Sequence, residues 1–505
     1  MSSSLSSTGL SPAEPTLSKP FKTALVLLAG ITLFRLWYAT RIDLVPDEGY
    51  YWLWSRHLAA SYRDKGPLVA WIIALGTHLF GPTVFGIRFF AVILSSLTGW
   101  VLFAFTRRLY NDSTALTALV VAGITPIIAV GSVLMTIDTP SVLSWAAAMW
   151  IFWSALHHDR LSLWFWLGLV IGAGFLAKFT NGVQLISIGW FLLVSKAHRQ
   201  WLFSRRIVLL GGAFALSISP IIWWNFQTGW VHISALHARS GVTNHFEIHP
   251  SELLQFIGGQ LGVVSPLFMA GMVVAVVHAF RHLRDERLHF LLSQWVPLYA
   301  LFGFFSLNVA GQPNWPAPAL IPGIILMTVF WKNHAQMHPR WRWAVWAAMA
   351  AALIMTIVLH DTDYLHLPPR QDPLRRAKGW HDFAAHVQAA RDRFHANLLI
   401  ADNYSQASMM SFYLPDQPVT YLLPQPYGTT QFSLWPEYKV TPETRALYVT
   451  TSTDSAPSEL VAAFSHVERV DDFWSLHDGR KVREFVIYYG SNQPGTQGPS
   501  KTPQP

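Results

Sequence analysis

The chain has 505 residues, of which 52% are hydrophobic and only 13% charged, whereas an average soluble protein carries about 25% charged residues. The formal charge is +8, but the sequence has no Lys/Arg-rich arm with interleaved aromatic residues of the kind that binds nucleic acid. The basic residues stand beside apolar runs, which indicates that they orient the chain in a membrane. The sequence contains no cysteine, which excludes disulfides, thiolate metal sites and a cysteine nucleophile.

Long apolar runs fill most of the first 360 residues. A helix that crosses the hydrocarbon core needs about 20 apolar residues, and eleven runs are candidates: 21–40, 84–105, 114–133, 140–156, 161–177, 181–195, 207–224, 253–279, 289–307, 316–331 and 343–359. The shorter run at 67–80 is bounded by Pro67 and Gly81-Pro82 and fits an interfacial or re-entrant helix. No cleavage signal follows the first run, so we expect it to be retained as a span.

The distribution of Lys and Arg predicts the orientation of these spans. Basic residues in short loops concentrate on the cytoplasmic side of a membrane. With the N-terminus inside, every inner loop is basic, from Arg107-Arg108 after the second span to Arg340 and Arg342 before the last. The pattern therefore predicts a cytoplasmic segment 1–20, a transmembrane domain 21–360 and a C-terminus on the other side. We expect the Ser- and Pro-rich segment 1–20 to be disordered, and the chain to be a multi-pass protein of the cell (inner) membrane.

The last third of the chain is more polar. Strand-like stretches at Ala396–Ala401, Ala446–Thr450 and Val482–Tyr489 predict a small soluble α/β domain over 361–490, on the extracytoplasmic side. The Gly/Pro/Ser/Gln-rich segment 491–505 is typical of a disordered tail.

The first outer loop begins with adjacent acids and an aromatic run. Asp47 and Glu48 follow Pro46, where a helix start is expected, and Tyr50 and Tyr51 come directly after them. An acid at this position could cap a surface helix. It could equally be a catalytic carboxylate, with the tyrosines binding a substrate at the membrane interface, and both interpretations stay open at this point.

Cations follow in the same loop. Arg63 and Lys65 flank Asp64, so the loop offers candidate phosphate-binding groups close to the candidate base. Lys178 stands in a very short outer turn between two later spans, where it could hold an anionic head group. The alternative for Lys178 is a lysine that extends along the helix to reach the interface.

Two further outer positions carry polar residues. Asp138 stands at the outer end of the third span, just before Pro140. Ionisable residues at membrane depth are usually functional, although a helix cap before Pro140 is an equal alternative. Asn314 and Trp315 occupy a Pro-bounded outer turn, where they could bind a sugar or simply form a turn with an interfacial Trp.

The long outer loop from Asn225 to Glu252 contains several histidines: His232, His237, His245 and His249. Their spacing matches no standard zinc pattern. We therefore assign no metal and no cofactor; a divalent metal is compatible with the sequence but receives no support from it.

In their order and spacing, these residues resemble the bacterial dolichyl-phosphate-mannose-protein mannosyltransferase-like glycosyltransferases, which share the GT-C fold with the lipid A aminoarabinose transferase. The residues that carry the resemblance are Asp47 to Trp52, Asp64 to Leu68, Met135 to Pro140, Lys178, Asn314 to Pro318, Ala401 to Ser405 and Phe412 to Pro415. One departure is Gly66, where the family more often has a second proline.

The resemblance implies a GT-C-like, α-helical polytopic membrane protein with a small C-terminal α/β extracytoplasmic domain. It implies that Asp47 is the catalytic carboxylate, that Asp138 is the second acid and that Lys65 contacts the phosphate of a lipid carrier; Glu48 and Lys178 are carried over with them. The implied donor is a polyprenyl-phosphate sugar, transferred with inversion.

Elementary chemistry agrees with this assignment. A sugar on a lipid phosphate already has a good leaving group, so the enzyme needs a base for the acceptor hydroxyl and cations for the departing phosphate. Asp47 can supply the base, and Lys65 with Arg63 or Lys178 the cations. The acceptor stays open among a glycolipid, a polysaccharide and a protein.

Two other classes of function are compatible with many spans and a few charges at the membrane edge. A secondary transporter or lipid-linked sugar flippase is the first, but transporter sites lie near the bilayer midplane at broken helices of paired repeats. The acids of this chain stand at outer helix ends. A non-catalytic membrane protein whose outer domain binds a partner is the second.

Overall fold

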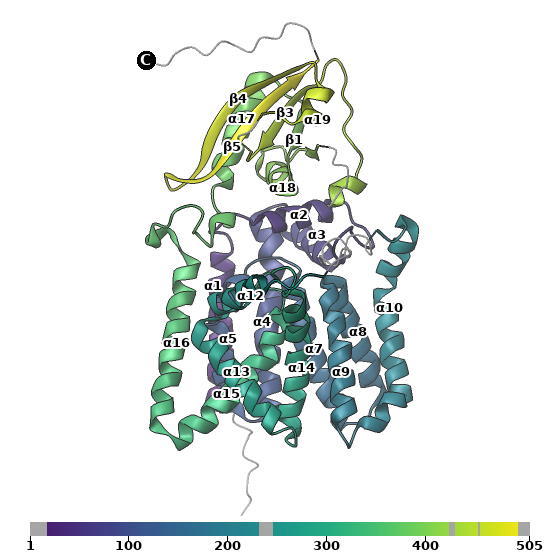
Figure 1. Cartoon of the computed structure of the whole chain (residues 1–505), viewed down its shortest axis with the longest axis vertical. Coiled ribbons are helices and arrows are strands. Elements are labelled where there is room, and N and C mark those ends of the chain that lie inside the picture. Colours follow the sequence, from purple (N-terminus) through teal and green to yellow (C-terminus); the bar gives the residue numbers. More distant parts are fainter. Residues whose placement is uncertain (1–17, 232–245, 424–429, 453–454, 493–505) are drawn as a thin grey trace, which may run out of the picture.

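The computed structural model describes residues 18–231, 246–423, 430–452 and 455–492, and it stacks a sheet-containing part on a larger helical part (Figure 1). The predicted disordered ends, 1–20 and 491–505, lie almost entirely outside these residues. The helical part contains α1 Lys19–Tyr38, α2 Pro46–Arg56, α3 Leu68–Phe80, α4 Val84–Leu109, α5 Asp112–Gly123, α6 Pro126–Gly131, α7 Asp138–His157, α8 Leu161–Ala177, α9 Val183–Val194, α10 Arg205–Thr228, α12 Pro250–Val264, α13 Pro266–Arg281, α14 Glu286–Phe305, α15 Leu320–Met337 and α16 Pro339–His360.

Among the described residues, five helices are long and apolar enough to cross a membrane, namely α1, α4, α10, α14 and α16. The bent pair of α12 and α13 makes a sixth if it is counted as one span. All eleven predicted runs are helical for most of their length, and the prediction of a multi-pass α-helical membrane protein is confirmed. The number of eleven crossings stays a prediction.

The hydropathy of the run at 253–279 predicts one continuous helix, but the structure divides this run into two. The chain bends by 109° between α12 and α13. Ser265, at the bend, has a φ of 88°, and Pro266 begins the next helix. Because a proline disfavours helical conformation in the residue before it, the two halves cannot share one axis.

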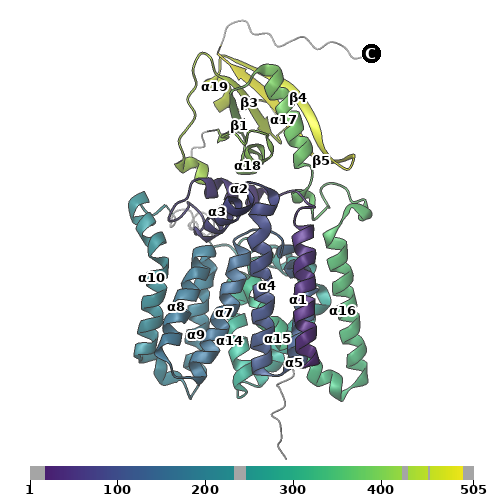
Figure 2. The ribbon, with the colours of Figure 1, turned by 180° about the vertical axis from the view of Figure 1, so that it is seen from behind.

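Helices α2 and α3 lie between the long helices and the sheet (Figure 2). With 13 residues, α3 is shorter than a crossing requires. It turns back tightly onto α4: a Cβ atom at Gly76 would lie 2.2 Å from the carbonyl oxygen of Gly86. The run at 67–80 is therefore a separate short helix at this level of the molecule.

The C-terminal part is built on a five-stranded sheet in the order β2-β1-β3-β5-β4. Its strands are β1 Leu398–Ala401, β2 Tyr421–Leu422, β3 Arg445–Thr450, β4 His466–His477 and β5 Arg480–Ser491. Strand β1 pairs in parallel with β2 and β3, whereas β5 pairs antiparallel with β3 and β4. The predicted α/β character is confirmed, and the three predicted strands correspond to β1, β3 and β5.

Helices cover both faces of this sheet. α17 Trp380–Phe394 and α18 Tyr404–Tyr413 pack on one face, and α19 Ser458–Ala463 packs on the other. The hydrophobic core of the first face continues into the helical part, because Phe383 and Met409 belong to the same buried cluster as Trp52 of α2 and Ile73 of α3. The sheet is thus held on α2 and α3 by a shared core.

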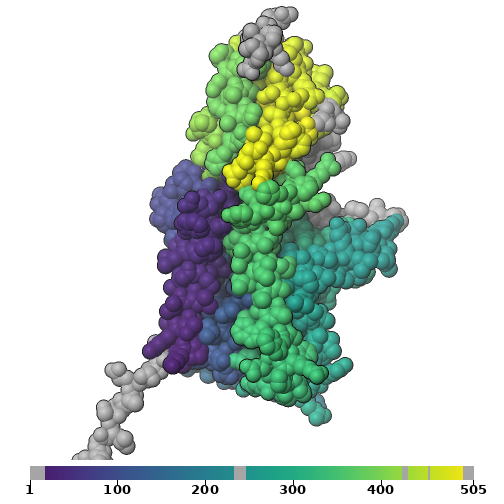
Figure 3. Space-filling view, turned by 90° about the vertical axis from the view of Figure 1, so that its left-hand side faces the viewer, coloured from purple at the N-terminus to yellow at the C-terminus, as the bar shows by residue number. Residues whose placement is uncertain are grey.

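The first and last long helices, α1 and α16, lie side by side below the sheet (Figure 3). The Tyr38 hydroxyl at the end of α1 donates a hydrogen bond to the carbonyl oxygen of His360 at the end of α16. Both helices therefore end at the same level, directly below the sheet part.

Candidate active site

An amphipathic cavity of about 760 Å³ lies between the long helices and reaches the segment that connects α16 to the sheet. Apolar side chains of α1, α4, α5 and α15 line its inner part, among them Leu28, Leu102, Leu119 and Ile321. Polar residues line the other end: Asp47, Thr136, Asp138, Asn314 and Arg376. The cavity can therefore hold a molecule with a long apolar portion and a polar head.

Asp47 occupies the first turn of α2 at the polar end of the cavity. Its Oδ2 accepts a hydrogen bond from Arg376 Nη2 at 2.9 Å, and its Oδ1 accepts one from the Tyr404 hydroxyl at 3.1 Å. Burial and the Asp47 carboxylate raise the pKa of Tyr404 to about 12, so this hydroxyl stays protonated and donates. The N-cap of α2 is Val45, so the capping interpretation of Asp47 is wrong.

Glu48 is the neighbour of Asp47 in the chain but points into the protein, where it is fully buried. Arg88 Nε and the backbone N–H of Met135 donate to Oε1, both at 2.8 Å. Arg88 Nη2 and the N–H of Val45 donate to Oε2, at 2.5 and 3.0 Å. A carboxylate has about four acceptor sites, so all of them are used within the protein. This geometry gives Glu48 a structural role, and its role as a catalytic acid stays a prediction.

Asp138 is the first residue of α7, and side chains from two other segments converge on it. Lys178 Nζ donates to its Oδ1 at 2.7 Å, and the Asn314 side-chain amide donates to its Oδ2 at 2.7 Å. Lys178 also donates to the carbonyl oxygen of Trp315 at 3.2 Å. The carboxylate thus holds side chains rather than capping α7, whose N-cap is Ile137, so the capping interpretation is wrong here too.

Lys178 is only 7% exposed and its ammonium group contacts Asp138, so the alternative of a lysine that extends to the interface is also wrong. The contacts bring Asp138, Lys178, Asn314 and Trp315 together, as their positions in predicted outer turns suggest. Asp47 and Asp138 line one cavity. Their catalytic roles stay a prediction.

Arg63 and Lys65 are not among the residues that line this cavity. Their loop packs against the end of α8: a Cβ atom at Gly66 would lie 2.0 Å from the carbonyl oxygen of Leu176. Gly66 therefore allows a close backbone approach that any side chain would prevent. The close contact explains why glycine stands at a position where the family more often has proline. The phosphate-binding roles of Arg63 and Lys65 stay a prediction.

Tyr50 and Tyr51 are buried side chains of α2, the helix that carries Asp47. The Tyr50 hydroxyl accepts a hydrogen bond from the backbone N–H of Gln431 at 2.5 Å, and its ring packs 4.8 Å from that of Tyr404. Burial, followed by the nearby charge of Asp47 and two other acids, raises the pKa of Tyr51 well above its ordinary value. These contacts support the shape of the site, and direct substrate binding by either tyrosine stays a prediction.

Sequence reasoning missed three residues of the site. Arg376 and Tyr404 come from the C-terminal part, more than 320 residues after Asp47, and no local pattern links them. Arg35 of α1 lines the cavity and is 7% exposed. Arg35 was visible as an ionisable residue inside an apolar run, which is itself a functional signal.

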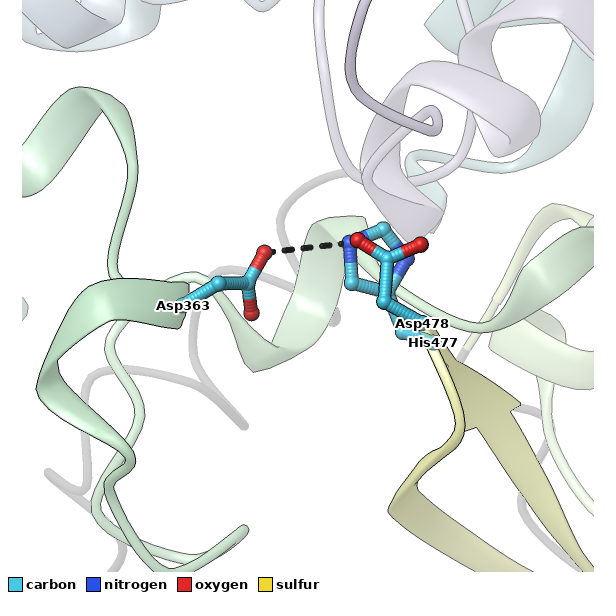
Figure 4. A group of neighbouring side chains, drawn as sticks. All are labelled: Asp363, His477 and Asp478. Carbon is cyan, nitrogen blue, oxygen red and sulfur yellow. Dashed lines mark ion pairs between the residues drawn. The ribbon is translucent and has the colours of Figure 1, made fainter.

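The predicted histidine loop falls mostly outside the described residues, which include His249 but not His232, His237 or His245. A different group of possible metal ligands is formed by His477 and Asp478, at the tip of the β4–β5 hairpin, and by Asp363, which faces them from the segment after α16 (Figure 4). Asp363 is already paired with Lys378 Nζ at 2.8 Å and with His477 Nε2 at 3.3 Å. The pair with His477 ties the hairpin to the segment after α16.

Comparisons with known proteins agree with the observed fold. A family model described as dolichyl-phosphate-mannose-protein mannosyltransferase matches residues 64–224. A lipid A galacturonosyltransferase of Rhizobium johnstonii is 24% identical over 434 residues, which cover 82% of this chain and 88% of the relative. An undecaprenyl phosphate-α-4-amino-4-deoxy-L-arabinose arabinosyl transferase of Pseudomonas aeruginosa is 28% identical, over 61% of this chain and 59% of that relative.

Among solved structures, the crystal structure of ArnT from Cupriavidus metallidurans bound to undecaprenyl phosphate superposes with a TM-score of 0.67 at 16% identity. The match covers 95% of this chain and 100% of that one, so the whole fold is shared. The resemblance predicted from the sequence is confirmed, and this chain is a membrane glycosyltransferase with the GT-C fold.

Proposed function

We propose that this glycosyltransferase moves a sugar from a polyprenyl-phosphate carrier to an acceptor on the non-cytoplasmic face of the membrane, with inversion at the anomeric carbon. The observation that carries the proposal is the amphipathic cavity, which combines Asp47 and Asp138 at one end with an apolar inner part between the helices. A polyprenyl chain matches the apolar part, and the sugar phosphate matches the polar end.

In this mechanism, Asp47 accepts the proton of the acceptor hydroxyl as the acceptor oxygen attacks the anomeric carbon. The bond from that carbon to the phosphate oxygen breaks, and the polyprenyl phosphate leaves with the electron pair. Arg376 and Tyr404 hold one oxygen of Asp47 each, and a carboxylate oxygen with two acceptor sites can still receive the substrate proton. A base must be held within hydrogen-bond reach of its proton, and these two contacts support that role.

The cavity has its own cations for the phosphate. Arg376 and Arg35 both line it, and an arginine beside a phosphate forms short, charge-assisted hydrogen bonds. Lys65 and Arg63 could assist from the neighbouring loop. Lys178 is engaged with Asp138, so we assign it, together with Asn314, to holding that second carboxylate against the sugar or the acceptor.

The proposed orientation places the N-terminus in the cytoplasm and the sheet outside, in the inner membrane. α4 begins next to α3, close to the sheet part, and ends with Arg107 and Arg108 after 26 residues. A straight helix of this length is about 39 Å long, so the basic end lies on the far side from the sheet. Basic residues favour the cytoplasmic side, which supports an extracytoplasmic site.

The names of the relatives support the choice of substrates. One is a lipid A galacturonosyltransferase, and the other uses an undecaprenyl phosphate-linked aminoarabinose. We therefore propose undecaprenyl phosphate as the carrier and a phosphorylated glycolipid of the lipid A type as the acceptor.

The direct test is transfer by the purified full chain in detergent, from a radiolabelled undecaprenyl-phosphate sugar to lipid A. We expect the labelled sugar to appear in the glycolipid. One molecule of unlabelled undecaprenyl phosphate should be released for each sugar transferred. A flippase would instead move the labelled carrier across a vesicle membrane and leave the sugar attached to it, and that outcome would contradict the proposal.

A further inference from the structure

A second cavity, of about 420 Å³, lies in the sheet part next to the start of α2. Its lining is rich in arginine: Arg370, Arg375, Arg376 and Arg483. Glu484 is the one acid among its lining residues in the described part of the chain. The cavity therefore carries a net positive charge.

This arginine cavity adjoins the active site through a shared residue. Arg376 lines both cavities and contacts Asp47 at 2.9 Å. Pro46, the residue before Asp47, also lines the arginine cavity. A group bound there would therefore lie beside the proposed catalytic base, on the sheet side.

Arg483 shows how closely the positive charges are gathered. Its guanidinium lies 4.3 Å above the ring of Trp380, and its Nη2 donates to the carbonyl oxygen of Arg375 at 3.1 Å. Its Nη1 is buried without a hydrogen-bond partner among the described residues. Burial, and then the charges of Arg375 and Arg376, lower the pKa of Arg483 to about 10. Like charges at close range repel one another, and a bound anion would relieve this cost.

The helix α18 adds to the positive potential. Asn403, Ser405 and Gln406, at its N-terminus, line the cavity, and the first turn of this 10-residue helix contains no acid. The N–H groups of Ser405 and Gln406 donate to Asn403 Oδ1 at 2.9 and 3.4 Å, so the helix contributes the positive end of its dipole rather than free donors. The arginines and the helix dipole therefore both favour an anion in this cavity.

We propose that the arginine cavity binds a phosphate group of the glycolipid acceptor and so positions the acceptor beside Asp47. The inference rests on the proposed function for the identity of the ligand, whereas the affinity of the cavity for a phosphate oxyanion does not depend on it. Several guanidinium groups match the geometry of a phosphate monoester, which arginine binds through paired N–H donors.

Two variants test the proposal, each in the full-length purified chain. Arg483→Gln removes the most enclosed cation, and Arg370→Gln removes an exposed one that is free of core packing. Arg391→Gln is the matched control, because it breaks an exposed pair with Asp416 elsewhere on the sheet part.

The first measurement is independent of transfer. Inorganic phosphate, compared with chloride at equal ionic strength, should raise the unfolding temperature of the wild type and of Arg391→Gln, and it should do so less for the two variants. Equal protection of all four proteins would overturn the proposal and leave the proposed function untouched.

The second measurement distinguishes the phosphate of the acceptor from that of the donor. For each variant, we expect the KM for a phosphorylated glycolipid to rise about ten-fold or more, as loss of a charged hydrogen bond predicts, with the KM for the polyprenyl-phosphate sugar unchanged. A rise in the donor KM alone would overturn the proposal. Absence of any transfer by the wild type would instead refute the proposed function, and the phosphate measurement would still decide the cavity.

Discussion

Asp47 of α2 and Arg376 of the sheet part are joined by a 2.9 Å ion pair across the boundary between the two parts of the molecule. The carboxylate side chain is 33% exposed, so it is accessible from the cavity while it is held. The proposed base is therefore positioned by a residue that the transmembrane helices do not supply. This gives the C-terminal part a direct role in the site.

Removing Arg376 should reduce activity without unfolding the protein. A charge-assisted hydrogen bond contributes about 1.5–3 kcal/mol, so Arg376→Gln should lower kcat/KM by about 10- to 100-fold. Arg376→Lys should recover part of the loss because it restores the charge but not the planar geometry. Transfer assays together with thermal unfolding provide the measurement, and Arg391→Gln is the control. Full activity of Arg376→Gln would contradict the assigned role.

Amide substitution of the adjacent acids Asp47 and Glu48 should affect the stability of the fold to different extents. Glu48→Gln leaves Arg88 buried without a counter-charge, and breaking a buried ion pair costs about 3–5 kcal/mol. We expect a marked fall in the unfolding temperature of Glu48→Gln and almost none for Asp47→Asn. Differential scanning calorimetry of the two variants checks this. Equal unfolding temperatures would show that the Glu48 network does not stabilise the fold.

Lys178 and Asp138 should behave as one unit. Lys178→Met leaves a partly buried carboxylate short of one donor, which costs about 1–3 kcal/mol. We expect lower stability and lower activity for the single variant. In a double-mutant cycle with Asp138→Asn, the two effects should not add, because the second change removes the charge that the first left unpaired. Strict additivity would show that the two groups act separately.

The docking of the sheet part should weaken slightly as the pH rises through the neutral range. A hydrogen bond from His381 to Asp43, at 2.7 Å, raises the pKa of His381 above 6.5, while burial opposes the shift. Since the folded-state pKa is the higher one, the pair stabilises the fold fully below about pH 6.5. This contribution is lost as the pH rises through the raised value.

The effect is small because the His381 side chain is mostly exposed. Unfolding temperatures of the wild type between pH 5.5 and 8.5, compared with those of His381→Gln, provide the measurement. The variant should have the flatter profile. Parallel profiles would mean that this pair does not contribute to docking.

The helical architecture could be predicted because apolar runs of membrane length leave few alternatives to helices. The bend at Ser265 could not be predicted, because both sides of the break are apolar and the hydropathy does not change there. Strand β4 was missed for a different reason. It is an edge strand with much of its length exposed, so residues such as Glu468 and Asp471 hide its alternation.

The site was predictable only in part. Asp47 and Asp138 stood out because both are acids at outer helix ends, and both line the cavity. Asp47 and Glu48 looked equivalent in the sequence, but successive residues of a helix point about 100° apart, which turns one to the cavity and the other to Arg88. Arg376 and Tyr404 reach Asp47 only through the folding of the sheet part onto α2, and no local pattern encodes that contact.

The most direct test of the account is the transfer activity of purified Asp47→Asn. Label is followed from an undecaprenyl-phosphate sugar to lipid A, in parallel with the unfolding temperature of the same preparation. We predict loss of transfer by at least about 100-fold, as expected when a general base is removed, with unfolding unchanged from the wild type. A folded Asp47→Asn protein with wild-type activity would contradict the central claim.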